Sequence, residues 1–313
     1  MQALVTGATG YIGRELCRQL LAQGTVLVPL SCRGGALPCG RVTRAVDFRQ
    51  DTIAGPLLEG IDVVYHLAGI AHQRAPAQQY EVVNHRATIA LAEAAERAGV
   101  RLFVYLSSIK AMGPASGGGS RREDEVAPPA DPYGLSKWQA ECALRERFAG
   151  SAMAVVILRP ALVYGPRAQG NLQWLLRAVR CGFPAPPEGG ARSMVGIEDL
   201  VQLLLLLSRV VAEGVHTWIV TDGEAYTTRQ VYQLLCEALG RSGGGQQLPA
   251  WCWRLFATAL DVLKREPRGS SYGKLFGAER YDNQALVRAT GWQPCQTLAS
   301  AAPAIVARPA VAT

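Results

Sequence analysis

The chain has 313 residues, of which 49% are hydrophobic and 18% charged, and it contains 33 Gly and 18 Pro. This composition excludes disordered, collagen-like and small disulfide-stapled chains, and it is typical of an α/β enzyme with one large or two smaller domains. The net charge of +7 comes from 32 basic and 25 acidic residues, without a run of five basic residues. The excess therefore favours small phosphate-bearing ligands over a nucleic-acid partner.

The eight cysteines are scattered, without a C-x-x-C pair or a nearby His at zinc-ligand spacing. We therefore expect a reducing compartment and no metal site. The sequence opens on a strand-like segment that lacks the features of a secretory signal, and its longest aliphatic run, 203–207, is too short to span a bilayer. These features favour a cytoplasmic protein without a transmembrane segment.

Short apolar runs alternate with helical patterns through the first half of the chain. Such strands, apolar on both faces and separated by helices, predict an α/β fold with a doubly wound parallel sheet. The predicted strands are 3–5, 26–30, 42–46, 63–67, 102–106 and 154–158, and the predicted helices are 11–22, 78–98 and 132–148.

After Pro160 the pattern changes, because loops rich in Gly and Pro interrupt shorter helices. This change indicates a second, smaller lobe. A helix at 197–211 and a strand at 216–220 could return to the sheet, and a further helix is predicted at 226–238. We expect residues 242–245 and the tail from Ala301 to be flexible.

The apolar helix predicted at 251–263 has two interpretations. It contains the sequence Trp251-Cys252-Trp253-Arg254-Leu255-Phe256. Such a helix can rest on a membrane or a partner protein. We favour the alternative, in which it packs in the core.

A glycine motif follows the first predicted strand and opens the first predicted helix. Gly7 permits a tight turn, Gly10 lets the backbone approach a pyrophosphate, and Gly13 allows close packing of helix on strand. The free N–H groups at the helix N-terminus would bind the phosphates. An ordinary Gly-rich turn is the alternative, but the place in a β-α-β unit favours a dinucleotide site. Its predicted residues are Gly7, Thr9, Gly10, Tyr11, Ile12 and Gly13.

The second predicted strand ends in Ser31-Cys32-Arg33, without the carboxylate that holds the free ribose of NAD. Arg33 is placed to meet a 2′-phosphate, so we expect NADP(H) to be preferred. If Arg33 is only a solvated loop residue, NAD(H) remains possible. We interpret His66 as a packed strand residue. Further cofactor contacts are expected near the adenine, from Asp47 and Phe48, and along the ribose and phosphates, from Leu67, Ala68 and Gly69.

Tyr133 and Lys137 are four residues apart on a predicted helix, so both side chains can enter one pocket. A nearby ammonium favours the phenolate, and we expect Lys137 to draw the pKa of Tyr133 toward neutral pH. The phenol could then exchange a proton with an alcohol or ketone, while Lys137 also holds a ribose hydroxyl. Ser107 and Ser108 end a predicted strand, where Ser108 could hydrogen-bond the same substrate oxygen. YxxxK alone is common, but behind a glycine motif it predicts the catalytic residues Ser108, Tyr133 and Lys137.

Together these motifs resemble the extended short-chain dehydrogenase/reductase family of sugar-nucleotide epimerases, dehydratases and reductases, over essentially the whole chain. The resemblance implies a Rossmann-like sheet with a smaller α/β substrate-binding lobe. We assign 1–165 plus about 197–222 to the dinucleotide-binding domain, and 166–196 plus 223–313 to the sugar-nucleotide-binding lobe. Other matching segments are Val83-Asn84, 158–166, Gly170-Asn171, 192–195, 198–200 and 291–294.

The resemblance also implies roles outside the catalytic centre. Residues that match Asn171 and Arg192 contact the nucleotide diphosphate, and the segment after Pro160 lines the nicotinamide. A planar guanidinium suits this task because it binds phosphate oxygens in pairs, although Arg192 could also be a plain surface residue. Lys110 either places a cation near the substrate or faces solvent. The residue sets are Ser107, Tyr133, Lys137 and Pro160 as further cofactor contacts, and Ser108, Lys110, Asn171 and Arg192 as substrate contacts.

The reaction is narrowed by the segment Ser108-Ile109-Lys110, which lacks the acidic pair of 4,6-dehydratases and the Cys of 3,5-epimerase/reductases. The reactions of this family that remain are those that transfer a hydride to or from C4 of the sugar. Segments 106–110, 131–138, 192–196 and 221–224 resemble bacterial UDP-4-keto-6-deoxy-N-acetylhexosamine 4-reductases of O-antigen clusters. This resemblance implies reduction of the C4 ketone of such a UDP-sugar, in the synthesis of surface lipopolysaccharide precursors.

Two other functions stay open. One is a UDP-hexose or UDP-N-acetylhexosamine 4-epimerase with retained NAD. The other is a non-catalytic NADP-binding regulator on the same fold, since fold does not fix function. In either case helices 78–98 and 132–148 could form the four-helix bundle of a homodimer.

Overall fold

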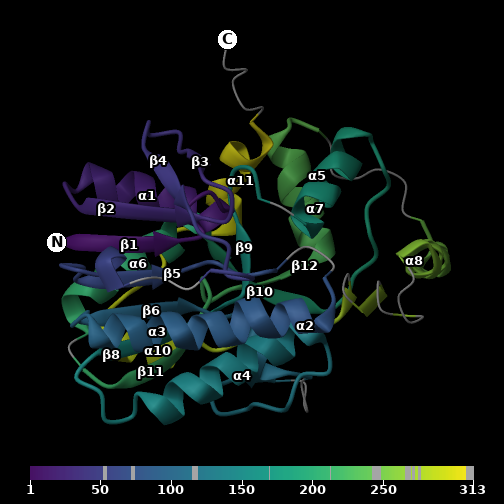
Figure 1. Cartoon of the computed structure of the whole chain (residues 1–313). Coiled ribbons are helices and arrows are strands. Elements are labelled where there is room, and N and C mark those ends of the chain that lie inside the picture. Colours follow the sequence, from purple (N-terminus) through teal and green to yellow (C-terminus); the bar gives the residue numbers. More distant parts are fainter. Residues whose placement is uncertain are drawn as a thin grey trace.

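A twisted sheet of mostly parallel strands forms the centre of the structure, a computed structural model that describes residues 1–51, 55–71, 75–114, 119–168, 170–211, 213–241, 248–264, 269, 272–273 and 276–307 (Figure 1). Over these residues the sheet has eight strands in the order β11-β8-β6-β5-β1-β2-β4-β3, and only β3 and β4 pair antiparallel. This confirms the predicted doubly wound parallel sheet, and the strand at 216–220 does return to it. The strands are β1 (Gln2–Thr6), β2 (Val26–Ser31), β3 (Gly35–Ala36), β4 (Val42–Ala45), β5 (Val63–His66), β6 (Leu102–Leu106), β8 (Ala154–Pro160) and β11 (Val215–Val220).

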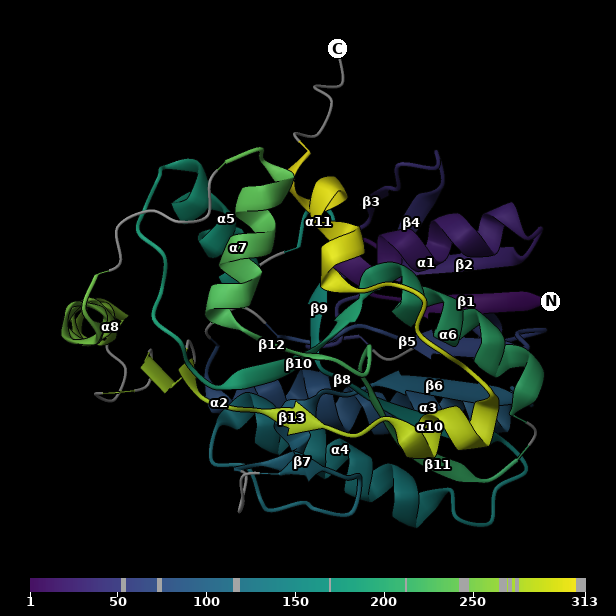
Figure 2. The same cartoon turned by 180° about the vertical axis from the view of Figure 1, so that it is seen from behind.

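Helices cover both faces of this sheet (Figures 1 and 2). Because successive strand residues point to opposite faces, Ala3 and Val5 of β1 pack with one set of helices and Leu4 packs with the other. This alternation explains why the strands are apolar throughout. The first set consists of α1 (Tyr11–Ala22), α6 (Ile197–Val210) and α10 (Gln284–Thr290), and the second of α3 (Ala87–Arg97) and α4 (Pro132–Arg147).

The predicted helix at 78–98 is one helical run with an unusual centre. It begins as α2 (Ala77–Tyr80), passes through a π-helical segment, η2 (Glu81–Arg86), and continues as α3. Such π turns are often found at functional sites. Here the segment carries the buried Asn84. Short 3₁₀ turns are found at η1 (Gly55–Leu57) and η3 (Ile109–Met112).

A smaller layer of strands and helices lies beyond the carboxyl ends of the large sheet (Figure 2). In its three-stranded sheet β10 pairs parallel with β9 and antiparallel with β12, and a separate pair joins β7 to β13. Helices α5, α7 and α11 share one apolar core. The bounds are β7 (Ser120–Arg121), β9 (Leu162–Tyr164), β10 (Ala191–Gly196), β12 (Ala225–Thr227), β13 (Arg280–Tyr281), α5 (Asn171–Arg180), α7 (Thr228–Ala238) and α11 (Leu298–Val306).

The expectation of a flexible tail from Ala301 is wrong for the described residues. Helix α11 starts at a capping box, in which Thr297 Oγ1 accepts from the Ser300 backbone N–H. Its Leu298 and Ile305 side chains are buried against α5 and α7. The small apolar residues of this segment therefore form a packed helix over Leu298–Val306. The other segment expected to be flexible, 242–245, lies outside the described residues.

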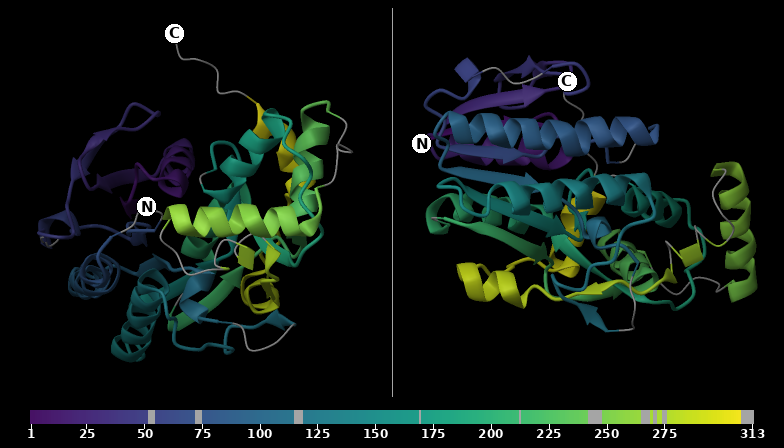
Figure 3. Two further views of the ribbon diagram at one scale, coloured as in Figure 1. Left: turned by 90° about the vertical axis from the view of Figure 1, so that its right-hand side faces the viewer. Right: turned by 60° about the horizontal axis from the view of Figure 1, so that its bottom comes forward.

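The expectation that helix 251–263 packs in the core is also wrong. The helix, α8 (Ala250–Lys264), lies at the edge of the molecule, away from the large sheet (Figure 3). Its Trp251, Leu255 and Val262 side chains are more than half exposed. In the part of the chain that the structure describes, none of the helices combines the length and apolarity needed to cross a bilayer.

Candidate active site

The glycine turn between β1 and α1 has no room for side chains. Gly7 has a φ of +67°, and the Gly10 N–H donates to the Gly7 carbonyl at 2.9 Å. A Cβ on Gly13 would lie 2.2 Å from that carbonyl oxygen, so only glycine lets the helix start this close to the turn. Thr9 and Gly10 remain accessible at the helix N-terminus. This cradle fits a dinucleotide pyrophosphate.

Tyr11 and Ile12, predicted as cofactor contacts, are half-buried at the start of α1. Both side chains pack against the core between α1 and α6. The Tyr11 hydroxyl is buried without a hydrogen-bond partner among the described residues. It lies beside Gly165, where an added Cβ would come within 2.8 Å of it.

The segment after β5 is held by a buried chain of hydrogen bonds. His66 Nδ1 bonds to Thr6 Oγ1 at 2.8 Å, and His66 Nε2 bonds to Thr88 Oγ1 at 2.9 Å. Burial, with a smaller effect from Lys137, lowers the pKa of His66 to about 3. His66 is therefore a neutral, packed residue, which confirms the interpretation from the sequence. The Ala68 N–H donates to Thr6 Oγ1 at 3.1 Å, so the same hydroxyl holds the predicted cofactor segment.

Leu67, Ala68 and Gly69 lie between the glycine turn and the predicted catalytic helix. A Cβ on Gly7 would meet the Ala68 backbone nitrogen at 2.9 Å, and a Cβ on Gly69 would lie 3.4 Å from Lys137 Nζ. Asn84 fixes this segment, because its amide oxygen accepts from the Ile70 N–H at 2.8 Å. The structure therefore brings these predicted cofactor residues together at one edge of the sheet.

The end of β2 places Arg33 in an exposed position. Asp47, which follows β4, lies beside the end of β2 and accepts from Arg49 Nε at 2.9 Å. Its hydrogen bonds to Arg49, with a smaller one to Cys32, lower the pKa of Asp47 to about 2. A carboxylate therefore stands next to the end of β2, although the strand itself supplies none. Phe48 packs edge-on against His66, with 5.7 Å between ring centroids.

Helix α4 positions Tyr133 next to Ser108. Asp131 caps the helix by accepting from the Gly134 N–H at 2.9 Å. Gly134 packs closely on the turn after β6, where an added Cβ would lie 2.6 Å from the Lys110 carbonyl oxygen. Burial raises the pKa of Tyr133 to about 12, and a hydrogen bond with Ser108 partly offsets this effect.

Lys137 lies one turn after Tyr133 and is almost fully buried. Its Nζ donates to the Leu106 carbonyl at 2.8 Å and lies 4.6 Å from the centre of the Tyr105 ring. Burial lowers the pKa of Lys137 to about 7, and Glu141 acts in the opposite direction. The expectation that Lys137 draws the Tyr133 pKa toward neutrality is therefore wrong, because desolvation dominates at both residues.

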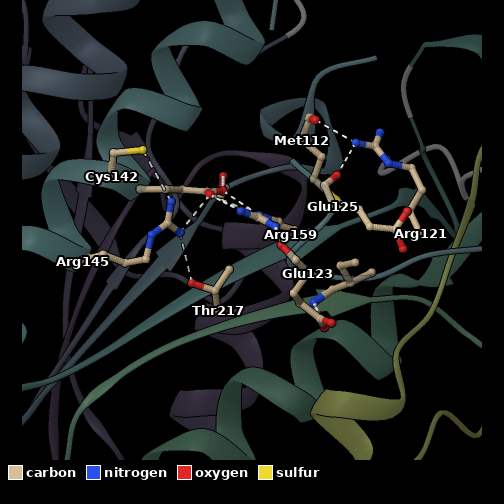
Figure 4. Close-up of polar contacts among 11 residues, drawn as sticks. Met112, Arg121, Glu123, Glu125, Cys142, Arg145, Arg159 and Thr217 are labelled. Carbon is tan, nitrogen blue, oxygen red and sulfur yellow. Dashed lines mark hydrogen bonds and ion pairs between the residues drawn. The ribbon is translucent and has the colours of Figure 1, made fainter. Parts of the chain in front are cut away.

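A buried ion pair below the site was missed from the sequence. Glu141 lies one turn after Lys137 and accepts from Ser107 Oγ at 2.5 Å. Arg159 on β8 donates to the same carboxylate, from Nη2 at 2.6 Å and from Nε at 3.1 Å. Arg159 Nη1 also donates to the Glu123 backbone carbonyl at 2.8 Å, and Figure 4 shows Arg159 beside Glu123 and Arg145. An arginine in a fully buried strand needs a negatively charged partner, so the position of Arg159 in the sequence could have predicted a buried ion pair.

Two predicted substrate residues meet at Glu279, which the sequence analysis did not identify. Lys110 Nζ lies 3.1 Å from Glu279 Oε1, and Arg192 Nη2 lies 4.0 Å from the same oxygen. Arg192 also donates to the carbonyls of Gly277 and Gly273, at 3.0 and 2.7 Å. Asn171 begins α5, and its side chain lies outside the described residues. Pro160 ends β8 and is buried.

Comparisons with known proteins agree with this arrangement. The model of the NAD dependent epimerase/dehydratase family matches residues 3–221. A UDP-glucose 4-epimerase of Vibrio cholerae is 31% identical over 94% of this chain and 91% of its own length. An N-acetyl-alpha-D-glucosaminyl-diphospho-ditrans,octacis-undecaprenol 4-epimerase of Escherichia coli O157:H7 is 27% identical, over 84% of this chain and 80% of its own.

The fold is shared with solved structures. One of them, MoeE5 in complex with UDP-glucose and NAD, aligns with a TM-score of 0.77 and 24% identity. The alignment covers 98% of this chain and 97% of MoeE5. The glycine turn, Ser108, Tyr133 and Lys137 all fall inside the segment that the family model matches. The chain belongs to the NAD dependent epimerase/dehydratase family.

Proposed function

We propose that this protein is a UDP-sugar 4-epimerase that acts on a UDP-hexose or a UDP-N-acetylhexosamine. The observation that carries the proposal is the position of Tyr133 and Lys137 on one face of α4, beside Ser108 and the glycine turn. The Vibrio cholerae relative supports the reaction, since its similarity extends along nearly the whole chain. The sequence resemblance implied reduction of a C4 ketone as the first candidate function. Epimerisation at C4 now takes that place.

The residues around the glycine turn fit NAD(H). The turn at Gly7–Gly13 would hold the pyrophosphate, and Lys137 would hold the nicotinamide ribose. Bound NAD would supply the hydride chemistry at C4 of the sugar. The NAD in the MoeE5 complex supports this cofactor. The Asp47 carboxylate beside the end of β2 also suits a free ribose better than a 2′-phosphate.

Tyr133 on α4 and Ser108, the residue before η3, would transfer and stabilise the proton. Tyr133 Oη would take the proton from the C4 hydroxyl when C4 is oxidised to the ketone, and would return a proton to the same oxygen when the ketone is reduced from its opposite face. Ser108 Oγ hydrogen-bonds the phenol and would steady that oxygen. A protonated Lys137 would favour the phenolate form of Tyr133 during this step.

The smaller lobe, 166–196 with 223–313, would bind the sugar nucleotide, while 1–165 with about 197–222 holds the cofactor. Lys110 and Arg192 lie together at Glu279, and they would exchange this carboxylate for the oxygens of a diphosphate. Asn171 is a further proposed contact. Binding of the diphosphate would then free Glu279.

We also propose a homodimer built on α3 and α4. These helices lie side by side on one outer face of the sheet (Figure 3). An exposed ion pair between Glu93 and Arg147 joins them. Two copies related by a two-fold axis could pack these four helices into one bundle.

A 4-reductase that uses NADPH is the second candidate. The exposed Arg33 after β2 favours it, because a guanidinium there could meet a 2′-phosphate. The two candidates differ in their need for added cofactor, since an epimerase returns the hydride to the same sugar.

The test is to incubate the purified protein, without added cofactor, with UDP-N-acetylglucosamine and separately with UDP-glucose, and to follow the 4-epimer by NMR. We expect the 4-epimer of one of them to reach equilibrium. If neither is converted, and the protein instead consumes NADPH stoichiometrically with a UDP-4-keto-6-deoxy-N-acetylhexosamine, the reductase replaces the epimerase. Equal dissociation constants of wild type and Arg33→Ala for NADPH would exclude a role for Arg33.

A further inference from the structure

Helix α8 presents an exposed apolar stripe at the edge of the molecule. Trp251, Leu255 and Val262 are spaced so that their side chains fall on one face of a helix. They are 63%, 61% and 69% exposed. Figures 1 and 3 show the helix standing at the end of the structure farthest from the N-terminus. Single exposed apolar residues are ordinary, but a stripe along one helix is typical of a docking surface.

The opposite face of α8 holds the helix in place. Trp253 packs edge-on against Phe183 and Phe276, with ring centroids 5.5 and 6.0 Å apart. Ala257 is buried on the same side. Because this inner face is already packed, the outer stripe is a fixed feature of the surface.

The charges of α8 are arranged asymmetrically. Its single acidic residue, Asp261, is fully buried and accepts from the Gly269 N–H at 2.7 Å. Arg254 is exposed next to the stripe, with its guanidinium 5.6 Å from the centre of the Tyr272 ring. The helix ends at Lys264, and the sequence then adds Arg265 and Arg268 against one Glu266. The outer side of the helix therefore combines apolar side chains with the Arg254 guanidinium, while the Asp261 carboxylate is buried on the inner side.

We propose that α8 docks the protein onto the surface of an anionic lipid bilayer. Trp251, Leu255 and Val262 would enter the boundary between headgroups and acyl chains, and Arg254 would meet the lipid phosphates. Interfacial helices combine these features: aromatic and aliphatic residues on one face, and basic residues at its border. The chain's net charge of +7 favours the same kind of surface.

A second copy of the chain fits the stripe less well. A stable protein interface uses about 20–30 residues on each side, whereas the stripe offers three large apolar side chains. A bilayer needs no complementary shape, so a narrow stripe with a basic border is sufficient for it. The proposed epimerase reaction does not use this surface. Membrane docking and epimerase activity can therefore be tested, and can fail, independently of each other.

The test is co-sedimentation of the full chain with vesicles of phosphatidylcholine, with and without phosphatidylglycerol. We expect binding to the anionic vesicles, weakened by added salt because the lipid charge is screened. The variant W251S/L255S/V262S should lower the partition coefficient by about tenfold or more, since each residue buries apolar area in the interface. Trp174→Ser is the matched control, because Trp174 on α5 is 67% exposed and should leave binding unchanged.

A second measurement keeps the test valid if the triple variant does not fold. Brominated lipids quench tryptophan fluorescence at the acyl boundary, and Trp251→Phe should remove most of that quenching while Trp174→Phe leaves it in place. Equal binding to both vesicle types, equal binding of the triple variant, or quenching that survives Trp251→Phe would each overturn the proposal. Concentration-dependent dimerisation that is lost in the triple variant, without vesicle binding, would assign the stripe to a second copy instead.

Discussion

Tyr133 is the side chain on which the proposed chemistry depends, and its surroundings hold it in the neutral form. Burial raises its pKa to about 12, whereas the neighbouring Lys137 has a pKa of about 7. The pair is therefore uncharged at the higher pH values at which a free lysine would still carry a proton. In the proposed reaction a protonated Lys137 would favour the phenolate form of Tyr133, which accepts the substrate proton.

For Tyr133→Phe we expect the turnover number to fall by about 10²–10⁴, the usual contribution of a positioned proton donor or acceptor. The dissociation constant for NAD should change little, because the glycine turn and Lys137 hold the cofactor in the proposed site. Steady-state kinetics and a fluorescence titration measure the two quantities. A loss of turnover smaller than tenfold would remove Tyr133 from the mechanism.

Lys137→Met tests the cost of burying this lysine. The folded-state pKa of about 7 lies below the ordinary 10.5, so between these values the unfolded chain binds more protons than the folded chain. The free energy of unfolding of the wild type should therefore rise between pH 7 and 10.5 relative to the variant. Urea denaturation at a series of pH values measures this difference. The control is Lys110→Met, which removes an exposed lysine, and its free energy of unfolding should follow that of the wild type across this pH range. If the curves of wild type and Lys137→Met are parallel, burial of Lys137 does not lower its pKa.

At the scale of elements, the ion pair between Glu141 on α4 and Arg159 on β8 ties the catalytic helix to the sheet. Both side chains are almost fully buried, and Ser107 at the end of β6 bonds to the same carboxylate. Three elements are thus joined next to Lys137. Exposed pairs such as Glu93 with Arg147 join α3 to α4 without this constraint.

Glu141→Gln should lower the free energy of unfolding by about 3–5 kcal/mol, because it leaves the Arg159 guanidinium buried without its countercharge. Arg147→Gln, at the exposed pair, should cost about 0–1 kcal/mol. The double variant E141Q/R159M should recover part of the loss, since it removes the unpaired charge as well. Urea denaturation of these proteins and of the single variant Arg159→Met checks this, and additive losses in the double variant would show that the pair is not coupled.

The elements that the sequence predicted well are those set by local pattern. Helix 11–22 has the predicted bounds, and Tyr133 and Lys137 lie one turn apart on the helix that was predicted for them. The contacts that were missed join distant segments. Lys110 and Glu279 are 169 residues apart, and no local pattern indicates their pairing. Amphipathic pattern also cannot tell whether the apolar face of α8 meets protein or solvent, because the sequence is the same in both cases.

At the scale of the whole molecule, Asp222 connects the large sheet to the smaller lobe. It follows β11, and its Oδ2 accepts from the Tyr164 hydroxyl at 2.9 Å and from the Tyr226 hydroxyl at 3.0 Å. Tyr164 also donates to the Gln296 carbonyl at 3.0 Å, which ties in the segment before α11. The Asp222 carboxylate is thus one of the links between the proposed cofactor and sugar-nucleotide parts.

This connection predicts a pH dependence of stability that Asp222→Asn should remove. Burial raises the pKa of Asp222 to about 6, and the hydrogen bonds from Tyr164 and Tyr226 only partly oppose it. Since the ordinary value is 3.8, the folded chain binds more protons than the unfolded chain between pH 3.8 and 6. The free energy of unfolding of the wild type should therefore fall across this window relative to the variant, and the difference should stay level above it. In the Asp222→Asn variant the amide oxygen can still accept from both tyrosine hydroxyls. Asp124→Asn, which changes an exposed carboxylate, is the matched control. If the free energies of unfolding of wild type and Asp222→Asn differ by a constant amount from pH 4 to 7, ionisation of Asp222 does not destabilise the folded chain.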